Sequence, residues 1–413
     1  MRQTIGGWGR FPTCEAIVDL PRDLQSVRDF VRDPSHPAIP RGAGRSYGDA
    51  AVAGHVISGL PLRHLLAFDP STGLLHAQGG VTIDDIIRFA MPRGWFLPVT
   101  PGTKFPTLAG CVAADVHGKN HHVAGCLSAF VEQLEVVLAD GTLMSCSRTE
   151  SPGLFWGTHG GMGLTGLIYS VRLRLQPIRS AFLKNIRLRT RDLHETCRIL
   201  CSTQHRYPYS VAWIDTLCGA QRGRGHIMLG THAEDGRLGP IHRASRLTVP
   251  DLPVNLVVRS GLRPFNTITY RQQWRRRAAT TVHYDPYFYP LDAAGGWNRL
   301  YGPRGFLQFQ FAVPLDNGET VMAAVLDRTN RAAPCALAVL KTFGDHPSGP
   351  LGFPLPGFTL ALDFPRTRTI EDAVRAATDD VIDAGGRIYL AKDSVITPEQ
   401  LDAMYPRLDE FRQ

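Results

Sequence analysis

Residues 15–145 alternate between apolar runs of strand length and amphipathic runs of helix length. Within this part of the chain, Ile83, Ile86 and Ile87 recur at helical spacing, which places their side chains on one side of a helix. Thr82 precedes the run as a candidate N-cap, two aspartates follow in the first turn, and a glycine stands just past the end. The pattern therefore predicts a short, capped helix.

Strand patterns occur on both sides of the middle of the chain. Two apolar runs within residues 135–144 are joined by Asp140-Gly141, a pair typical of tight turns, which predicts a hairpin. Residues 170–176 alternate apolar and charged positions, so we expect a strand with one buried face. Residues 305–311 repeat a strand-like pattern. Short strands and short helices together predict an α+β fold.

The pattern becomes irregular and rich in arginine and proline after Pro177, so we place a domain boundary near residues 178–180. Residues 235–265 have the weakest periodicity and are expected to form a loop region. Regular structure returns at residues 369–384, where Thr369 opens a predicted helix and two glycines end it.

Composition adds only broad limits to this picture. The chain has 413 residues, of which 43% are hydrophobic and 20% are charged, so it can bury large cores. Lys+Arg 45 against Asp+Glu 37 gives a net charge of +8, which permits an anionic surface or a phosphorylated substrate. The most basic run, residues 271–277, fits either a phosphate-tracking patch or a solvated loop face. No second basic block supports it, so we expect no nucleic-acid partner.

The cysteines and the N-terminus bear on the cellular compartment. The 8 cysteines form no CxxC pair and lie near no His pair at metal spacing, so no metal site is expected. Scattered cysteines of this kind favour reduced thiols in a reducing compartment. The first twenty residues lack the apolar region of a secretory signal, and no apolar run approaches the roughly 18 residues of a membrane span. We expect a cytoplasmic protein without a transmembrane segment.

Two glycine-rich segments suggest nucleotide chemistry. Gly161 to Gly166 match the pattern G-x-G-x-x-G, but a strand-like run follows them, whereas the dinucleotide fingerprint must open a helix. We therefore interpret this segment as a tight turn that leads into a strand. Residues 39–49 contain three glycines that can expose several backbone N–H groups to one anion, and Arg41 and Arg45 add positive charge. The segment lacks the Gly-Lys-Ser/Thr ending of a Walker loop.

Residues 107–122 combine small side chains with polar ones. The small residues at 109–114 allow a flat ligand to come close, and His117, Lys119 and Asn120 place polar groups beside it. Taken alone, these polar residues fit a hydrogen-bonded loop cluster as well as a binding site.

A series of motifs runs along nearly the whole chain: PRGAGRSYGD, PVTPGT, GCVAADVHGKNHH, ADGT, FWGTHGGMGLTG, WNRLYGPRGFLQFQF and IYLAKDS. In this order they resemble the FAD-linked oxidases of the vanillyl-alcohol oxidase superfamily. The resemblance implies an α+β fold, with a two-subdomain FAD-binding (PCMH-type) domain over residues 1–179. A substrate-binding domain with an antiparallel sheet would cover residues 180–386, and a C-terminal segment, 387–413, would return to the FAD-binding domain.

The resemblance also implies roles for individual residues. The cofactor-binding residues would be Pro40, Arg41, Gly42, Ala43, Gly44, Arg45, Ser46, Tyr47, Gly48, Pro101, Gly102, Thr103, Thr107, Gly110, Ala113, Asp115, His117, Gly118, Asn120, Gly163, Ile168 and Tyr389. The substrate-binding residues would be Lys119, Tyr289, Gln308, Gln310, Lys341, Thr359 and Lys392. The catalytic residues would be Lys392, His117 and Tyr47, with Lys392 taking the hydroxyl proton or stabilising alkoxide character.

Two departures from the family pattern carry consequences. Covalent members of the superfamily attach flavin to a histidine at the position of Arg45, and an arginine cannot form that bond, so we expect non-covalent FAD. Relatives carry an Asn-x-Cys pair in the pocket where this chain has Thr359-Leu-Ala361. A threonine side chain offers fewer hydrogen bonds than asparagine, which leaves the identity of the sugar open.

The implied activity is oxidation of a secondary sugar hydroxyl, the C2 hydroxyl of a polyprenyl-phosphate pentose, to a ketone by hydride transfer to flavin N5. The same oxidation of a soluble natural-product sugar, aminoglycoside or nucleoside is the alternative. A flavin-binding protein without turnover, or a basic nucleic-acid binder, is a third reading. The implied partners are the lipid-phosphate-linked sugar, an NAD-dependent keto-sugar reductase that acts next, and a membrane touched from its surface.

Overall fold

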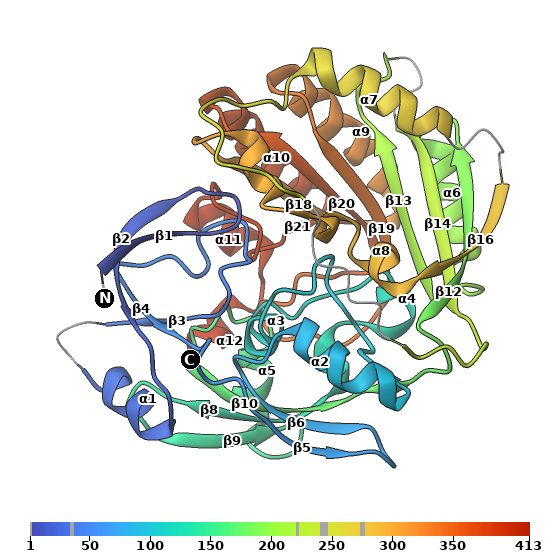
Figure 1. Cartoon of the computed structure of the whole chain (residues 1–413). Coiled ribbons are helices and arrows are strands. Elements are labelled where there is room, and N and C mark those ends of the chain that lie inside the picture. The colour runs from blue at the N-terminus through green and yellow to red at the C-terminus, as the bar shows by residue number, and fades with distance from the viewer. Residues whose placement is uncertain (1, 34–36, 220–222, 240–246, 273–276) are drawn as a thin grey trace.

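The structure, a computed structural model, describes residues 2–33, 37–219, 223–239, 247–272 and 277–413 (Figure 1). Helices and antiparallel sheets both contribute, so the chain has a mixed α+β architecture. Figure 1 shows the smaller sheets of the N-terminal part in the lower half of the view and the large sheet in the upper right. No helix within the described ranges has the length and apolar character needed to cross a membrane.

The first sheet has the strand order β1-β2-β4-β3. β1 is antiparallel to β2, whereas β4 is parallel to both β2 and β3. The strands are β1 (Arg2–Gly6), β2 (Thr13–Asp19), β3 (Ile39–Arg41) and β4 (His55–Ser58), and helix α1 (Leu24–Val31) follows β2. The predicted glycine-rich loop leaves the end of β3, so this sheet fixes where the loop begins.

The second sheet is antiparallel and has the order β5-β6-β10-β8-β9. Its strands are β5 (Leu65–Asp69), β6 (Leu74–Gln78), β8 (Val131–Val137), β9 (Leu143–Ser147) and β10 (Leu167–Arg174). Gly141 turns between β8 and β9 with a φ of 79°, which confirms the predicted hairpin. In β10, Val171 and Leu173 are fully buried while Arg172 is exposed, as the alternation predicts.

Short helices cover this second sheet and lead into the site. In α2 (Ile83–Ala90), Thr82 and Asp85 form a reciprocal capping box, which confirms the predicted helix. In α3 (Leu108–Ala113), the Thr107 hydroxyl accepts a hydrogen bond from the Gly110 N–H. The remaining elements are α4 (His121–Ala124), α5 (Pro152–Thr158), and the strand pair β7 (Trp95–Phe96) and β11 (Gln176–Pro177).

The large sheet has the order β16-β12-β14-β13-β19-β20-β18-β21, with antiparallel neighbours throughout. Its strands are β12 (Phe182–Thr190), β13 (Tyr209–Asp215), β14 (Arg224–His232), β16 (Arg277–His283), β18 (Phe306–Pro314), β19 (Leu337–Phe343), β20 (Gly357–Pro365) and β21 (Arg387–Ile388). Helices α6 (Leu193–Thr203), α9 (Leu315–Ala332) and α10 (Arg368–Asp383) pack on one face around buried Leu340, Leu360 and Phe311. The opposite face is left for the pocket.

Between β16 and β18 the chain packs on the N-terminal part. Helix α8 (Tyr284–Phe288) buries Tyr284, Tyr287 and Phe288 in the same core cluster as the second sheet. A 3₁₀ turn (Pro290–Ala293), the two-residue strand β17 (Ala294–Gly295) and a second 3₁₀ turn (Trp297–Tyr301) follow. β17 pairs with β15 (Leu247–Thr248).

The C-terminal residues contact both parts of the chain. Helices α11 (Pro398–Met404) and α12 (Leu408–Arg412) add Met404 and Tyr405 to the core beside the large sheet. The Tyr389 hydroxyl donates to the Ala114 carbonyl at 2.8 Å, and the Tyr47 N–H donates to the Ala391 carbonyl at 3.1 Å. This segment therefore joins the glycine-rich loop to the end of β21.

The structure tests the predicted turn at Gly161–Gly166 and the predicted helix at residues 369–384. Gly163 and Gly166 have φ values of 86° and 140° and lead directly into β10, which confirms a turn before a strand. Helix α10 is confirmed, but Thr367, not Thr369, caps it, because Thr367 is the extended residue whose hydroxyl accepts from the Ile370 N–H.

The expected loop over residues 235–265 is wrong at its end, because α7 (Arg259–Gln272) begins there. Its inward side chains find specific partners: Asn266 donates to Asp215 at 2.9 Å, and Tyr270 donates to the Thr190 carbonyl. Weak apolar periodicity hides a helix that is held by polar contacts. Residues 240–246 of the expected loop, and residues 273–276 of the basic run, lie outside the described residues.

Candidate active site

One pocket extends from the glycine-rich loop after β3 to the open face of the large sheet. The predicted site residues that line it are Pro40, Arg41, Gly42, Ala43, Gly44, Arg45, Ser46, Tyr47, Pro101, Gly102, Thr103, Thr107, Gly110, Ala113, His117, Gly163, Ile168, Gln308, Gln310, Lys341, Tyr389 and Lys392. The structure thus brings together loop residues and sheet residues that are more than 250 positions apart in the sequence.

The glycine-rich loop is held from both ends. The Arg41 guanidinium donates to the Ala51 carbonyl at 2.6 Å and to the Gly6 carbonyl at 2.8 Å, which ties the loop to the first sheet. Gly44 has a φ of 61°, in the left-handed region that favours glycine, and a Cβ there would lie 2.4 Å from an Arg41 nitrogen. The Arg45 guanidinium lies over the Trp8 ring, 4.2 Å from its centre, and 5.0 Å from that of Phe105.

The loop fits the diphosphate of FAD. Within the described part of the chain, the backbone N–H groups of Gly42, Ala43, Gly44, Arg45 and Ser46 form no hydrogen bond. Consecutive free N–H groups in a glycine-rich loop form a concave site for an anion, and the adjacent arginines add positive charge. The unpaired donors therefore match the acceptors that a pyrophosphate supplies.

Glycines line the pocket between the loop and the second sheet at Gly42, Gly79 and Gly163. A Cβ at Gly79 would lie 2.3 Å from the Ile168 carbonyl, and a Cβ at Gly42 would lie 2.3 Å from the Thr107 hydroxyl, so close packing within the wall requires glycine there. Gly163 has a φ of 86° and lies next to Pro40. Since these lining residues carry no side chain, the pocket wall consists of backbone at these positions.

The register of the large sheet arranges the polar side chains in rows. Gln308 of β18 lies opposite Asp363 of β20, and the Gln308 amide donates to the Asp363 carboxyl at 2.5 Å. In the next row Gln310 lies opposite Ala361, which in turn lies opposite Val339 of β19. These side chains share one face because they are two residues apart on each strand.

In the third row Lys341 of β19 lies opposite Thr359 of β20. Thr359 is fully buried and accepts a hydrogen bond from the Gln310 amide at 3.3 Å. The small side chain of Ala361 therefore stands at the centre of the face, with polar rows on either side of it.

His117 is held as a neutral imidazole at the centre of the pocket. The Gln310 amide donates to its Nε2 at 2.9 Å, so the ring proton sits on Nδ1. Burial lowers the pKa of His117 well below its usual value, and the nearby Lys341 charge lowers it further. Among the described residues, no group accepts a hydrogen bond from Nδ1, which leaves that donor for a ligand.

Lys392 stands at the junction between the loop and the sheet face. Its Nζ lies 3.5 Å from the centre of the Tyr47 ring, and burial lowers its pKa to about 7. The nearby Asp363 is buried, and burial raises its pKa to about 7, while Gln308 supports its ionised form. A lysine with such a pKa can exchange a proton near neutral pH.

Two further lysines increase the positive charge around the pocket. Burial lowers the pKa of Lys341 to about 7, and Lys119 and Lys392 lower it as well because like charges repel. Burial also lowers the pKa of Lys119 to about 8. Lys119 lies behind the pocket wall, where its Nζ donates to the Phe288 carbonyl at 3.0 Å.

The other predicted site residues do not line the pocket: Gly48, Asp115, Gly118, Asn120, Tyr289 and Thr359. Asp115 accepts hydrogen bonds from the Ser128 N–H and hydroxyl, both at 3.0 Å. The Asn120 amide donates to the Pro98 carbonyl at 2.8 Å, and Tyr289 is hydrogen-bonded to Thr100 at 2.6 Å. In the structure these side chains hold the wall loops in place.

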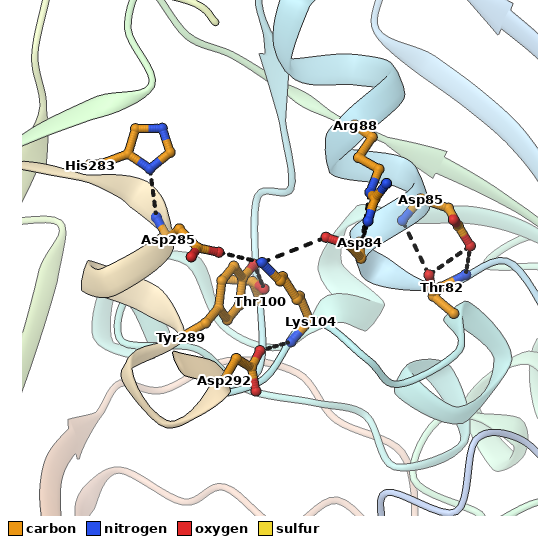
Figure 2. A network of polar contacts seen from close by, with 10 residues as sticks. All are labelled: Thr82, Asp84, Asp85, Arg88, Thr100, Lys104, His283, Asp285, Tyr289 and Asp292. Carbon is orange, nitrogen blue, oxygen red and sulfur yellow. Dashed lines mark hydrogen bonds and ion pairs between the residues drawn. The ribbon is translucent and has the colours of Figure 1, made fainter. Parts of the chain in front are cut away.

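A buried ion-pair network holds the same wall from outside the pocket (Figure 2). Lys104, only 3% exposed, donates from its Nζ to Asp285 of α8 at 2.5 Å and lies 3.8 Å from Asp84 of α2. Its backbone N–H donates to Asp292 at 2.9 Å. The single lysine therefore connects α2, α8 and the 3₁₀ turn that contributes Asp292 to the pocket.

Sequence reasoning missed several residues of this site: Lys104, Asp292, Trp297 and Asp363. Asp292 and Trp297 flank the Ala-Gly-Gly run at 294–296, a signal for a turn that could have drawn attention to them. Asp363 has no sequence signal beyond an acidic residue inside an apolar strand. Among the described residues, no group of three or more His, Cys, Asp or Glu side chains is arranged to hold a metal ion.

Comparison with known proteins identifies relatives of this chain. A family model described as an FAD binding domain matches residues 12–147. Decaprenylphosphoryl-beta-D-ribose oxidase of Mycolicibacterium smegmatis is 34% identical, over 98% of this chain and 92% of the relative. The "Uncharacterized protein in mprA 5'region" of Streptomyces coelicolor is also 34% identical, over 81% of this chain and 94% of the relative. Xylooligosaccharide oxidase of Thermothelomyces thermophilus is 24% identical over 40% of this chain and 34% of the relative.

Proposed function

The chain belongs to the family of FAD-dependent oxidoreductases that includes decaprenylphosphoryl-β-D-ribose oxidase, and we propose that it oxidises the C2 hydroxyl of a polyprenyl-phosphate pentose to a ketone. The observation that carries the proposal is the pocket itself, which joins a diphosphate-binding loop to a lysine-rich sheet face. The level of identity to the mycobacterial oxidase, maintained over nearly the whole chain, supports the same class of substrate.

In this proposal the residues of the loop and of its neighbours hold the cofactor. The free N–H groups of residues 42–46 bind the diphosphate, and the bare walls at Gly79 and Gly163 accept the flat parts. FAD bound there supplies the hydride acceptor of the reaction, flavin N5. From the same family resemblance we propose an FAD-binding domain of two subdomains over residues 1–179, a substrate-binding domain over 180–386 and a C-terminal segment over 387–413.

Lys392 is the proposed group that removes the hydroxyl proton. A pKa of about 7 leaves much of Lys392 neutral at physiological pH, and its charged form stabilises alkoxide character. Tyr47 holds the Nζ by its ring, and the neutral His117 donates from Nδ1 to a substrate oxygen. Asp363 is held by Gln308, and its negative charge raises the pKa of Lys392, which opposes the effect of burial.

Substrate recognition is assigned to the polar rows and the lysines around them. Gln308, Gln310 and Lys341 face the pocket, and Lys119, Tyr289 and Thr359 support the wall from behind. Lys341 and Lys119 supply positive charge for a phosphate group. Oxidation of the substrate at C2 gives a ketone. We propose that an NAD-dependent keto-sugar reductase reduces this ketone in the following step.

A direct experiment separates the lipid-linked substrate from the alternative. We would mix oxidised enzyme with a polyprenyl-phosphate pentose, or with free pentosides, aminoglycosides or nucleosides, and follow loss of flavin absorbance. Reduction by the lipid-linked sugar at a lower concentration supports the proposal. Reduction only by a soluble sugar would favour the alternative, for which the departure from the family pattern at Thr359 and Ala361 is the motive.

We expect FAD to leave the protein on denaturation. Arg45 occupies the position where covalent relatives carry the attachment histidine, and its guanidinium is packed against Trp8 and Phe105. Acid precipitation of the purified protein should therefore leave the flavin absorbance in the supernatant. Flavin that stays with the precipitated polypeptide would show covalent attachment and contradict the prediction.

The Michaelis constant for a phosphorylated sugar should rise with ionic strength. Attraction between the phosphate and Lys119, Lys341 and the arginines of residues 258–277 is screened beyond about 8–10 Å at physiological salt. We expect the limiting rate to change little, because salt weakens approach and binding rather than the chemical step.

The matched control for this effect is a neutral glycoside of the same sugar. Its Michaelis constant should be nearly independent of salt, because it carries no charge for the lysines to attract. Both substrates would be measured at low and high sodium chloride. An equally flat response for the phosphorylated sugar would remove the reason for assigning the lysines to a phosphate.

A further inference from the structure

Lysine is rare in this chain, and it is concentrated around the pocket. Only 5 of the 45 lysine and arginine residues are lysines, and Lys184 is the one that is exposed. The other four are buried or half-buried, and two of them, Lys341 and Lys392, line the pocket. A guanidinium stays charged at any physiological pH, whereas an amine in a poorly solvated setting can lose its proton. The chain therefore keeps the cations that can become neutral mainly at and around the site.

Lys341 is the pocket lysine for which the structure shows no partner. Lys104 is paired with the Asp285 carboxylate, and Lys119 donates to a backbone carbonyl. Among the described residues, Lys341 forms neither a hydrogen bond nor an ion pair, although it lines the pocket. An unpaired ammonium in such a setting is costly, so the neutral amine is favoured until a ligand supplies acceptors.

The neighbouring titratable groups favour the neutral amine as well. Burial lowers the pKa of Lys341 to about 7, and Lys119 and Lys392 lower it further because like charges repel. The nearby Cys126 would raise this pKa only as a thiolate, but burial raises the pKa of Cys126 well above its usual value. The thiol therefore keeps its proton near neutral pH and gives Lys341 no counter-charge.

The remaining groups that face Lys341 are uncharged near neutral pH. Burial lowers the pKa of His117 well below its usual value and that of His121 to about 3, and the charge of Lys341 adds to both effects. Thr359 lies directly opposite Lys341 on β20. The described surroundings of Lys341 thus consist of two lysines and neutral side chains, without a carboxylate paired to it.

A second donor without a partner lies close to Lys341. The Gln310 amide donates to Nε2 of His117 at 2.9 Å and to the Thr359 hydroxyl at 3.3 Å, so it connects His117 to the row that contains Lys341. Nδ1 of His117 has no acceptor among the described residues, and both His117 and Lys341 line the pocket. An anionic group with several oxygen atoms would supply acceptors for both donors.

We propose that Lys341 is the residue through which the pocket selects an anionic sugar over a neutral one, and that it takes up a proton from solvent when the anion binds. The inference rests on the proposed function, because it assigns the phosphate of that substrate to Lys341. The proton adds to the free amine and forms one new N–H bond on Nζ. The resulting ammonium then donates to a phosphate oxygen, and no other covalent bond changes.

The other two lysines near the phosphate are less suited to this role. Lys119 does not line the pocket, and its Nζ already donates to a backbone carbonyl at 3.0 Å. Burial lowers the pKa of Lys392 to about 7, but the charge of Asp363 raises it, so Lys392 has a counter-charge before any ligand binds. An arriving anion therefore changes the charge state of Lys341 more than that of either neighbour.

Proton uptake gives the affinity a defined dependence on pH. With a pKa of about 7, the Lys341 amine is about nine-tenths neutral at pH 8 in the free protein. Binding of an anion then adds most of one proton, so the dissociation constant should rise by up to about tenfold per pH unit above pH 7. This rise ends where the amine becomes neutral in the complex as well. A neutral sugar induces no uptake, so its dissociation constant should change little.

The experiment measures proton uptake by the FAD-loaded protein with ligands that cannot be oxidised at C2. Ethyl 2-deoxyribosyl phosphate is a phosphodiester whose negative charge does not titrate near neutral pH, and ethyl 2-deoxyriboside is its neutral counterpart. Isothermal titration calorimetry at pH 8 in HEPES and in Tris, which differ in ionisation enthalpy, gives the number of protons bound. We expect most of one proton per site for the phosphodiester and none for the riboside.

Two variants separate the charge of Lys341 from its titration. Lys341→Arg keeps a positive charge that cannot be lost, so it should bind the phosphodiester without proton uptake and without the rise in dissociation constant. Lys341→Met should bind the phosphodiester at least about tenfold more weakly at pH 7 and the riboside like the parent protein. Lys184→Met removes the exposed lysine of β12 and should keep the parent uptake. FAD content and thermal melting establish that each variant is folded.

A spectroscopic titration tests the same group without depending on how an arginine fits. Lysine labelled with ¹³C at the ε carbon gives 5 signals, and that of Lys341 is the one missing from Lys341→Met. Its midpoint should lie near pH 7 without ligand and move upward by at least about one pH unit with the phosphodiester. An unmoved midpoint, a parent protein without proton uptake, or uptake that survives Lys341→Arg overturns the proposal.

Flavin reduction separates this inference from the proposed function. Ethyl ribosyl phosphate, which carries the C2 hydroxyl, would be mixed with the oxidised protein under anaerobic conditions. Proton-linked binding without reduction would contradict the proposed oxidation and leave Lys341 as the anion-selecting residue. Reduction together with binding that takes up no proton would do the reverse. Tighter binding of the neutral riboside than of the phosphodiester at pH 7 would overturn the inference and favour a soluble sugar.

Discussion

Lys392→Ala should leave FAD bound and slow flavin reduction by about 10²–10⁴-fold, the usual contribution of a positioned acid–base group. The side chain lies at the sheet end of the pocket with its Nζ against the Tyr47 ring. The diphosphate-binding loop is held separately, by Arg41 and the first sheet, so the cofactor should not be lost with the lysine. Flavin content by absorbance and reduction by stopped flow under anaerobic conditions measure the two properties.

The pH dependence distinguishes a proton acceptor from a residue that only shapes the pocket. Burial lowers the pKa of Lys392 to about 7, so below that pH the amine is protonated and cannot accept the substrate proton. The reduction rate of the parent protein should therefore fall as pH drops through about 7 and level off above it. The alanine variant should lose this dependence.

The control is Lys184→Ala, which removes an exposed lysine from β12, outside the pocket wall. It should reduce flavin at the parent rate with the parent pH profile. A Lys392→Ala variant that reduced at near the parent rate with saturating substrate would rule out the acid–base role. A slow variant that kept the same pH dependence would move that role to another group, of which His117 and Asp363 are the nearest.

Local elements of the fold could be predicted because their signals lie within a few residues. The Thr82 cap, the hairpin at Gly141 and the buried side of β10 each depend on spacing that the sequence displays directly. The glycine-rich loop belongs to the same class, since its free N–H groups follow from three glycines and the lack of a following helix.

Contacts set by the register of the large sheet could not be predicted from such local signals in the sequence. Asp363 meets Gln308 only because β20 pairs with β18 in one register, and a shift of one residue would turn both side chains to the opposite face. Helix α7 was missed for a related reason. Its inward side is defined by hydrogen bonds to Asp215 and Thr190 in distant strands, which leave little apolar periodicity.

The replacement of the family's Asn-x-Cys pair gains a physical meaning from this register. Thr359 and Ala361 belong to adjacent rows of the pocket face, and Gln310 contacts one row while donating into the next. With Thr359 and Ala361 in place, His117 is still oriented by Gln310, so the groups assigned to chemistry are all present. The proposed oxidation is therefore compatible with the departure, and the selectivity for the sugar is the property that it affects.

Lys104→Met should lower the free energy of unfolding by about 3–5 kcal/mol, the usual cost of breaking a buried ion pair by removing one partner. Lys104 is 3% exposed and is the cation beside Asp285 of α8 and, at 3.8 Å, Asp84 of α2 (Figure 2). Methionine has a similar length but no charge, so the Asp285 carboxylate would lose its ammonium partner in a buried setting. Urea unfolding followed by tryptophan fluorescence measures the change.

The size of the loss identifies its cause. Arg174→Met, in the exposed pair between Arg174 and Glu132 on neighbouring strands, removes a cation from water and should cost less than about 1 kcal/mol. Adding Asp285→Asn to Lys104→Met should restore part of the lost stability, because the buried carboxylate is then neutral. If Lys104→Met lowered the free energy of unfolding no more than Arg174→Met, or if adding Asp285→Asn lowered it further, the ion pair would not be what joins α8 to the pocket wall. The same residue sets the position of Asp292 through its backbone only, so the methionine variant should keep that contact and retain a formed pocket below its unfolding transition.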